Sequence, residues 1–135
     1  MSEDQILMSE QCVCGKAKLF DQCCGVFLSG KQHAKTPEQL MRSRYCAYAK
    51  GGYGDYLYET WHPAIRHSLT PTSLSEVSVS WNKLEILEKS QKGNQGFVEF
   101  NAFYMDDQGK EKVLHERSSF QRIAGKWFYV GGEIE

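Results

Sequence analysis

The sequence predicts an α+β fold in which short helices come first and an antiparallel sheet of four strands follows. In the first half of the chain, apolar residues recur at the three-to-four spacing of a helix. From Trp81 onward they alternate with polar residues instead, which is the period of a strand. Three short turn sequences divide this second half, and tight connections between successive strands favour an antiparallel meander.

The first helix is predicted to begin after Thr36 and to end at Gly51-Gly52. Thr36 can accept a hydrogen bond from the free amide of Gln39, and Pro37 suits the first helical position. The run from Thr36 to Gln39 has the form of a capping box. The helix then continues with aromatic and apolar residues at helical spacing, namely Met41, Tyr45 and Tyr48.

Two shorter helical segments and the four strands are predicted to follow. Asp55 can cap a short second helix, Pro63 favours an extended conformation at His62, and Thr70-Pro71 starts a further helical turn. In the second strand both faces carry apolar side chains, so helices are expected to cover one face of the sheet and to leave the other partly covered. The strands are expected over residues 81–90, 96–105, 110–121 and 127–134.

The composition argues against several classes of function. The 135 residues include 16 Lys+Arg and 17 Asp+Glu, so no net field attracts nucleic acid or anionic lipid. The longest apolar run, Tyr45–Ala49, is far below the roughly 20 residues of a membrane span. The start of the chain has no signal-peptide pattern. We therefore expect a cytoplasmic protein without a membrane segment, in a reducing compartment where clustered cysteines serve as metal ligands or redox groups.

Four cysteines, Cys12, Cys14, Cys23 and Cys24, lie within 13 positions of the chain. Zinc takes four thiolates tetrahedrally, and a shell closed by four sulfurs leaves no position for a water molecule. We therefore expect one structural zinc ion per chain rather than a catalytic metal. Disulfide or redox use, an iron–sulfur cluster and simple burial of small side chains are the alternatives. Cys46, in the middle of the first helix, is expected to be buried as a small apolar side chain.

Two resemblances extend this interpretation. The run from Cys12 to Gly25 is similar to the SEC-C motif, a zinc-binding module also found in the SecA translocase motor. The chain resembles the bacterial YchJ-like family in four further stretches, Leu40–Tyr48, Asp55–Leu57, Thr60–Pro63 and Glu116–Phe120. This resemblance implies a SEC-C zinc-binding unit over residues 1–30. Over residues 31–135 it implies a nuclear-transport-factor-2-like domain, in which helices pack on a strongly curved antiparallel sheet.

Eight residues outside the cysteines are candidates for either a pocket or a structural brace. Arg42 and Arg44 can clamp an anion, or they can hydrogen-bond carbonyl groups or Glu116. His62 can act as a general acid or base, or it can belong to a packed corner. We favour the structural interpretation, because an arginine pair suits a brace between helix and sheet, and we assign no catalytic residue. The eight residues are Arg42, Arg44, Tyr45, Trp61, His62, Glu99, Glu116 and Arg117.

Two functions from different classes follow. The first is a non-catalytic binding or adaptor protein, in which the zinc stiffens a surface that docks a protein partner; the resemblance to the translocase module implies such docking. The alternative is a small-molecule-binding protein or enzyme that uses a pocket in the curved sheet. Paired charges in a filled cavity would favour the first function. An unpaired carboxylate or histidine beside an open space would favour the second.

Overall fold

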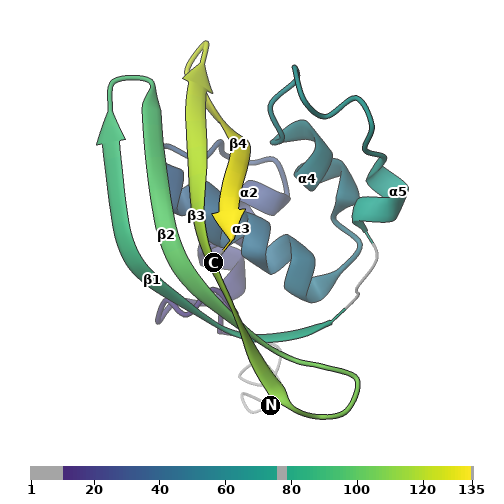
Figure 1. Ribbon diagram of the computed structural model, residues 1–135. Coiled ribbons are helices and arrows are strands. Elements are labelled where there is room, and N and C mark those ends of the chain that lie inside the picture. Colours follow the sequence, from purple (N-terminus) through teal and green to yellow (C-terminus); the bar gives the residue numbers. More distant parts are fainter. Residues whose placement is uncertain (1–10, 76–78, 135) are drawn as a thin grey trace, which may run out of the picture.

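The computed structural model describes residues 11–75 and 79–134 (Figure 1). Within these ranges, helices come first and strands follow, which confirms the predicted α+β fold. No helix in them is long and apolar enough to cross a membrane. The helices are the 3-10 turn η1 (Phe20–Gln22), α2 (Gly25–Leu28), α3 (Pro37–Lys50), α4 (Gly54–Glu59) and α5 (Pro71–Leu74). The strands are β1 (Ser80–Lys92), β2 (Gln95–Met105), β3 (Glu111–Ile123) and β4 (Lys126–Ile134).

The four strands form one antiparallel sheet in the order β1-β2-β3-β4, which confirms the predicted meander. The register shifts at two places in β1, between Trp81 and Lys83 and between Ile86 and Glu88. A third shift lies in the pairing of β3 with β4, at Ser119/Phe120. Such bulges bend a strand and increase its twist. Accordingly, the long strands curve around α3 in Figure 1.

Helix α3 packs against the concave side of this sheet. Alternate residues of β2, Val98, Phe100 and Ala102, are at most 4% exposed, whereas the residues between them are partly exposed. The predicted two-faced pattern of this strand is therefore confirmed. The main core joins α3 to β1, β2, β3 and β4, and its buried members are Ala34, Leu40, Met41, Tyr45, Leu84, Val98, Phe100, Ala102, Phe120 and Trp127.

The start of α3 follows the predicted capping pattern with one difference. Thr36 Oγ1 accepts a hydrogen bond from the Gln39 amide at 3.1 Å, as predicted. The Gln39 side-chain oxygen accepts from the amide of Lys35 at 2.8 Å, rather than from the amide of Thr36. The Lys35 carbonyl in turn accepts the indole N–H of Trp127 at 3.2 Å. The capping residues thereby connect the start of α3 to β4.

Helix α4 begins earlier than the sequence predicts. Its N-cap residue is Tyr53, and Asp55 lies inside the first turn without capping it. The predicted cap is wrong because Ser75, the residue after α5, supplies the acceptor: the amide of Gly54 donates to Ser75 Oγ at 2.8 Å. The predicted turn at Thr70-Pro71 is confirmed as α5, where Thr70 Oγ1 accepts from the Ser73 amide at 3.2 Å.

The contact between α4 and α5 gives the first prediction. A Cβ atom at Gly54 would overlap the Pro71 carbonyl oxygen and Ser75 Oγ. Because a backbone carbonyl cannot yield easily, we expect Gly54→Ala to lower the free energy of unfolding by about 2–3 kcal/mol. Gly131→Ala in β4 is the matched control, since a Cβ there meets no atom within 4 Å. Urea unfolding measures both variants, and equal midpoints would contradict this packing.

Candidate metal centre

Residues 11–28 fold into a compact loop that brings the four predicted cysteines together. Gln11 and Leu19 form an isolated antiparallel bridge, and the Cys12 amide donates to the Lys18 carbonyl at 2.8 Å. Gly15 has φ +97°, in the left-handed region that favours glycine, and this permits the tight turn after Cys14. The turn η1 and the short helix α2 then reverse the chain and place Cys23 and Cys24 opposite the first pair.

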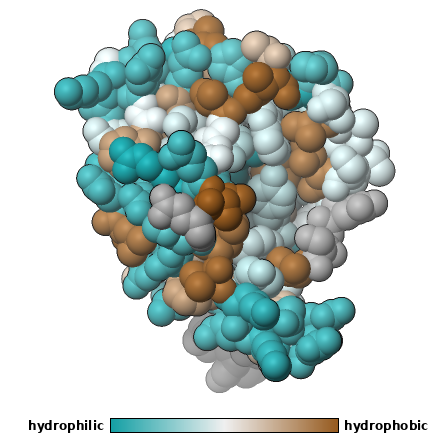
Figure 2. All heavy atoms as spheres, viewed as in Figure 1, coloured by the Kyte–Doolittle hydropathy of each residue, from teal (hydrophilic) through white to brown (hydrophobic). Residues whose placement is uncertain are grey.

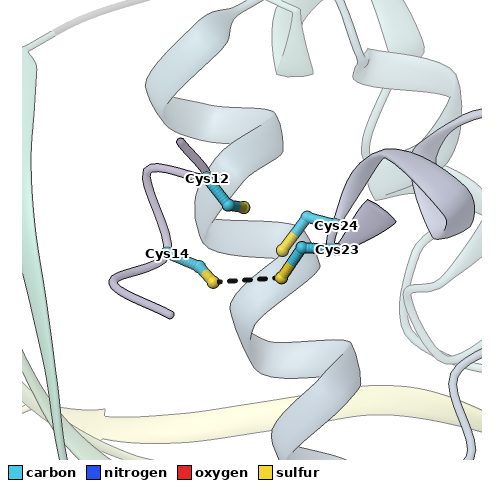
Figure 3. Close-up of side chains that lie close together, drawn as sticks. All are labelled: Cys12, Cys14, Cys23 and Cys24. Atoms are coloured by element: carbon cyan, nitrogen blue, oxygen red, sulfur yellow. Dashed lines mark hydrogen bonds between the residues drawn. The ribbon is translucent and has the colours of Figure 1, made fainter. Parts of the chain in front are cut away.

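The four sulfur atoms converge on one point (Figure 3). They all lie within 4.8 Å of one another, and Cys14 Sγ is 3.7 Å from Cys23 Sγ. Zinc–sulfur bonds of about 2.3 Å in a tetrahedron require sulfur separations of about 3.8 Å. A disulfide bond would need about 2.05 Å, and all four thiols are free. Cys12, Cys14 and Cys24 are buried while Cys23 is half-buried, so the four cysteines can hold a metal ion.

The protonation states of the cysteine thiols also suit the binding of a cation. Hydrogen bonds from Cys12, Cys24 and Cys46 hold the pKa of the Cys14 thiol far below its ordinary value. Burial, together with the negative charge of Cys14, raises the pKa of the Cys23 thiol to about 11. The hydrogen bond with Cys14 opposes ionisation of Cys12, but hydrogen bonds from Cys24 and Cys46 lower the pKa of the Cys12 thiol to about 6. A metal-free cluster therefore favours thiolates at Cys12 and Cys14 beside a neutral thiol at Cys23. A dication stabilises the remaining thiolates, because the deprotonated thiol is the form that binds metal.

The cysteine loop is fastened to the rest of the molecule through Arg42. Arg42 Nη1 donates to the Cys14 carbonyl at 2.6 Å, and Arg42 Nε donates to Glu38 at 2.8 Å. Glu38 also pairs with Lys89 of β1. This chain of contacts joins the loop, α3 and β1. The role of Arg42 is thus to position the turn beside Cys14, and the sequence did not indicate this partner.

A fifth sulfur lies beside the cluster. Cys46, on α3, is fully buried as predicted, and its Sγ is 3.5 Å from Cys12 Sγ. Sequence reasoning identified it as an apolar side chain and missed this proximity. No local spacing signals it, because α2, a loop and more than two turns of α3 separate Cys24 from Cys46, which meets the cluster only through tertiary packing. The hydrophobic neighbours of this second small core are Phe20 and Leu28.

A separate cavity of about 280 Å³ lies between α3 and the concave face of the sheet. Four of the eight candidate residues line it: Arg44, Tyr45, Trp61 and Glu116. Glu116 Oε2 accepts hydrogen bonds from Ser118 Oγ at 2.5 Å and from the Tyr129 hydroxyl at 3.0 Å. Most of the remaining wall is apolar or aromatic, and it includes Trp81, Phe100, Ala102 and Phe120.

Arg44 is a buried cation in the wall of this cavity. Its Nη1 donates to the Leu57 carbonyl at 2.8 Å and to Thr60 Oγ1 at 2.6 Å. Its guanidinium lies 4.8 Å from the Trp61 ring centre and 4.7 Å from that of Tyr129. Burial lowers the pKa of Arg44. Across residues 11–75 and 79–134 it forms no ion pair within 4.0 Å, so the contact with Glu116 weighed from the sequence is not made.

The other candidate residues lie away from the cavity. His62 Nε2 is 3.0 Å from Gln121 Oε1, and the His62 amide donates to the Tyr129 carbonyl at 2.8 Å. Glu99 and Arg117 lie on the opposite face of the sheet. There, Glu99 contacts His115 Nε2 at 2.7 Å and Arg117 Nη1 at 3.3 Å. The eight candidates therefore do not form one site.

The curved sheet around α3 and the four-cysteine loop together define a protein with a SEC-C motif followed by an NTF2-like domain. The family described as "YchJ, middle NTF2-like domain" matches residues 36–132. The chain belongs to this YchJ-like family, as the resemblance in the sequence implied.

Individual relatives agree with this assignment. A UPF0225 protein from Vibrio parahaemolyticus is 38% identical over 128 residues, which cover 93% of this chain and 75% of the relative. A UPF0225 protein from Streptomyces coelicolor is 40% identical over 127 residues, or 91% of this chain and 94% of the relative. The solution structure of a SEC-C motif containing protein from Rhodopseudomonas palustris is similar with a TM-score of 0.84 and 39% identity. The similarity covers 92% of this chain and 98% of that one.

Proposed function

We propose that this protein binds one structural zinc ion through Cys12, Cys14, Cys23 and Cys24 and uses the stiffened loop to bind another protein. The observation that carries the proposal is the convergence of four sulfurs within 4.8 Å of one another on a loop whose fully buried side chains are cysteines. That spacing suits a single ion, and thiolates are soft ligands that select zinc over magnesium or calcium. The proposal requires a reducing compartment such as the cytoplasm, where thiols persist.

The metal would have a structural role and not a catalytic one. Four thiolates close the tetrahedron and leave no position for a water molecule, so the ion has no route to hydrolytic chemistry. Four thiolates with one dication carry a net charge of about −2, which Lys16 and Lys18 on the same loop partly offset. Arg42 supports the loop at the Cys14 carbonyl, so the loaded unit would be held against α3.

Exposed residues of the loop are the surface that we propose for a protein partner, which we call the knuckle surface: Val13, Lys16, Lys18 and Leu19. Val13 is 42% exposed and Leu19 is 37% exposed, and both lysines are exposed. Two apolar side chains flanked by cations suit a partner that presents apolar residues with an acidic rim. The face seen in Figure 2 mixes hydrophilic residues with several groups of hydrophobic ones.

Metal content tests the first part of the proposal. We expect the purified chain to carry about one zinc per chain by elemental analysis, and Cys14→Ser or Cys24→Ser to abolish it. Structural zinc in finger peptides contributes about 10–16 kcal/mol, so removing it should leave residues 12–28 without hydrogen-exchange protection. Returning zinc to stripped wild-type protein is the control and should restore that protection. A metal-free wild type with a protected loop would refute the proposal.

Surface variants that leave the cysteines intact test the second part. We expect Val13→Asp combined with Leu19→Asp to weaken the capture of a partner from cell lysate at least about tenfold while the zinc stays bound. Leu87→Asp combined with Val113→Asp is the matched control, because these side chains are similarly exposed, at 48% and 52%, but lie on strands. The captured protein is identified by mass spectrometry and its affinity is measured with purified components. Equal binding by both double variants would contradict docking at the knuckle surface.

A second candidate function, small-molecule binding, is supported by the cavity. Arg44 is buried in its wall without an ion-pair partner among the described residues, and aromatic rings surround it. A small planar carboxylate would satisfy both features, with its charge near the guanidinium and its body against the rings. The Glu116 carboxylate lies in the same wall, so the charged end of such an anion would have to lie on the Arg44 side of the cavity.

The cavity can be tested with a pair of matched probes. We expect 2-naphthoate to quench the fluorescence of Trp61 and Trp81 and to bind about tenfold more tightly than the neutral 2-naphthamide. Ala102→Phe should fill the cavity and abolish the binding. Ala64→Phe, at an exposed position, is the control and should bind like the wild type. If neither probe binds, or if Ala102→Phe has no effect, the cavity is not a ligand site.

A further inference from the structure

We infer that Cys46 is a reserve ligand of the metal site, able to take the place of Cys23 in holding the same ion. The inference rests on the proposed zinc site and goes beyond it, because it assigns a metal-binding role to a fifth residue, on α3, outside the cysteine motif. It also gives the site two alternative sets of four sulfurs. Both sets share Cys12, Cys14 and Cys24.

The positions of the five sulfurs support this inference. Cys46 Sγ is 3.5 Å from Cys12 Sγ, close to the separation of about 3.8 Å between two thiolates on one tetrahedral zinc. Cys46 also lies in one buried cluster with Cys12, Cys14 and Cys24. Cys46 nevertheless lies outside the group of four whose sulfurs are all within 4.8 Å of one another. Cys23, in contrast, is partly buried and packs against the cluster that Cys12, Cys14, Cys24 and Cys46 form.

The two exchangeable residues differ in access to solvent. Cys46 is 0% exposed, whereas Cys23 is the half-buried member of the predicted ligand set. Oxidants and alkylating agents reach an exposed thiol first, so Cys23 is the ligand at greatest risk. When Cys46 replaces it, Cys46 loses a proton and Cys23, if unmodified, gains one, so the exchange is balanced in charge. The loss of the vulnerable ligand would then leave the ion bound.

The two ligand sets also differ in which parts of the chain they join, because Cys46 lies on α3 and not on the loop. Cys12, Cys14, Cys23 and Cys24 all belong to the loop, whereas Cys46 belongs to the helix that packs on the sheet. Use of Cys46 would tie the loop to α3 through the metal itself. That link would add to the hydrogen bond from Arg42 to the Cys14 carbonyl.

Four proteins test the inference: wild type, Cys23→Ser, Cys46→Ser and the double variant. We expect wild type and both single variants to retain about one zinc per chain by native mass spectrometry. In chelator competition, we expect Cys23→Ser to bind zinc within about 100-fold of wild type and the double variant to bind at least about 100-fold more weakly still. X-ray absorption of zinc-loaded Cys23→Ser should count four sulfurs. Equal zinc loss by Cys23→Ser and the double variant would overturn the inference.

A second measurement keeps the test independent of the folding of Cys23→Ser. Zinc-loaded wild type and Cys46→Ser are treated briefly with iodoacetamide. In molecules with a single modification, peptide mapping identifies the alkylated cysteine, and native mass spectrometry shows whether zinc is still bound. We expect wild type alkylated at Cys23 to keep its zinc and Cys46→Ser alkylated at Cys23 to lose it. Loss from both proteins would overturn the reserve role, as would loss of zinc from unmodified Cys46→Ser. A metal-free wild type would instead refute the zinc proposal itself.

Discussion

Helix α3 is buried on two sides against different partners, and the rest of the structure depends on this double contact. Consecutive residues of a helix point about 100° apart, so neighbouring side chains serve different sites. Tyr45 faces the core of the curved sheet, and Cys46 faces the cysteine cluster. Arg44 reaches the cavity wall, and Arg42 holds the carbonyl of Cys14. One helix of 14 residues thus sets the relative position of the sheet and the loop.

The cysteine loop has little other than sulfur with which to form a core. Its buried members are Cys12, Cys14 and Cys24, with Phe20 and Leu28 partly buried beside them. Several thiols in contact cannot all ionise, since each new thiolate would face the charge of its neighbour. The same closeness becomes favourable around a dication. The fold of this segment and its ability to hold a metal are therefore two aspects of one arrangement.

Features encoded over short distances in the chain could be predicted, whereas features made by tertiary packing could not. Thr36 and the paired glycines define α3, and turn residues separate four strands with alternating apolar side chains. The four cysteines lie close enough in sequence to be recognised as one site. The contact of Cys46 with that site, and of Arg42 with Cys14, depends on how α3 packs against the loop. The cap expected from Asp55 failed for the same reason, because Ser75 is brought to Gly54 by the packing of α5.

The bulges in β1 have a consequence for how the sheet can associate. A sheet of four strands has two outer strands whose free backbone groups can pair with another chain. Two irregularities interrupt β1, and its exposed residues include Lys83, Glu85 and Lys89. On the other margin, Thr60 and His62 exchange backbone hydrogen bonds with Tyr129 of β4. Both edges of the sheet thus resist the addition of a strand from another chain. Contacts with other molecules are therefore expected through side chains rather than through backbone hydrogen bonds between strands.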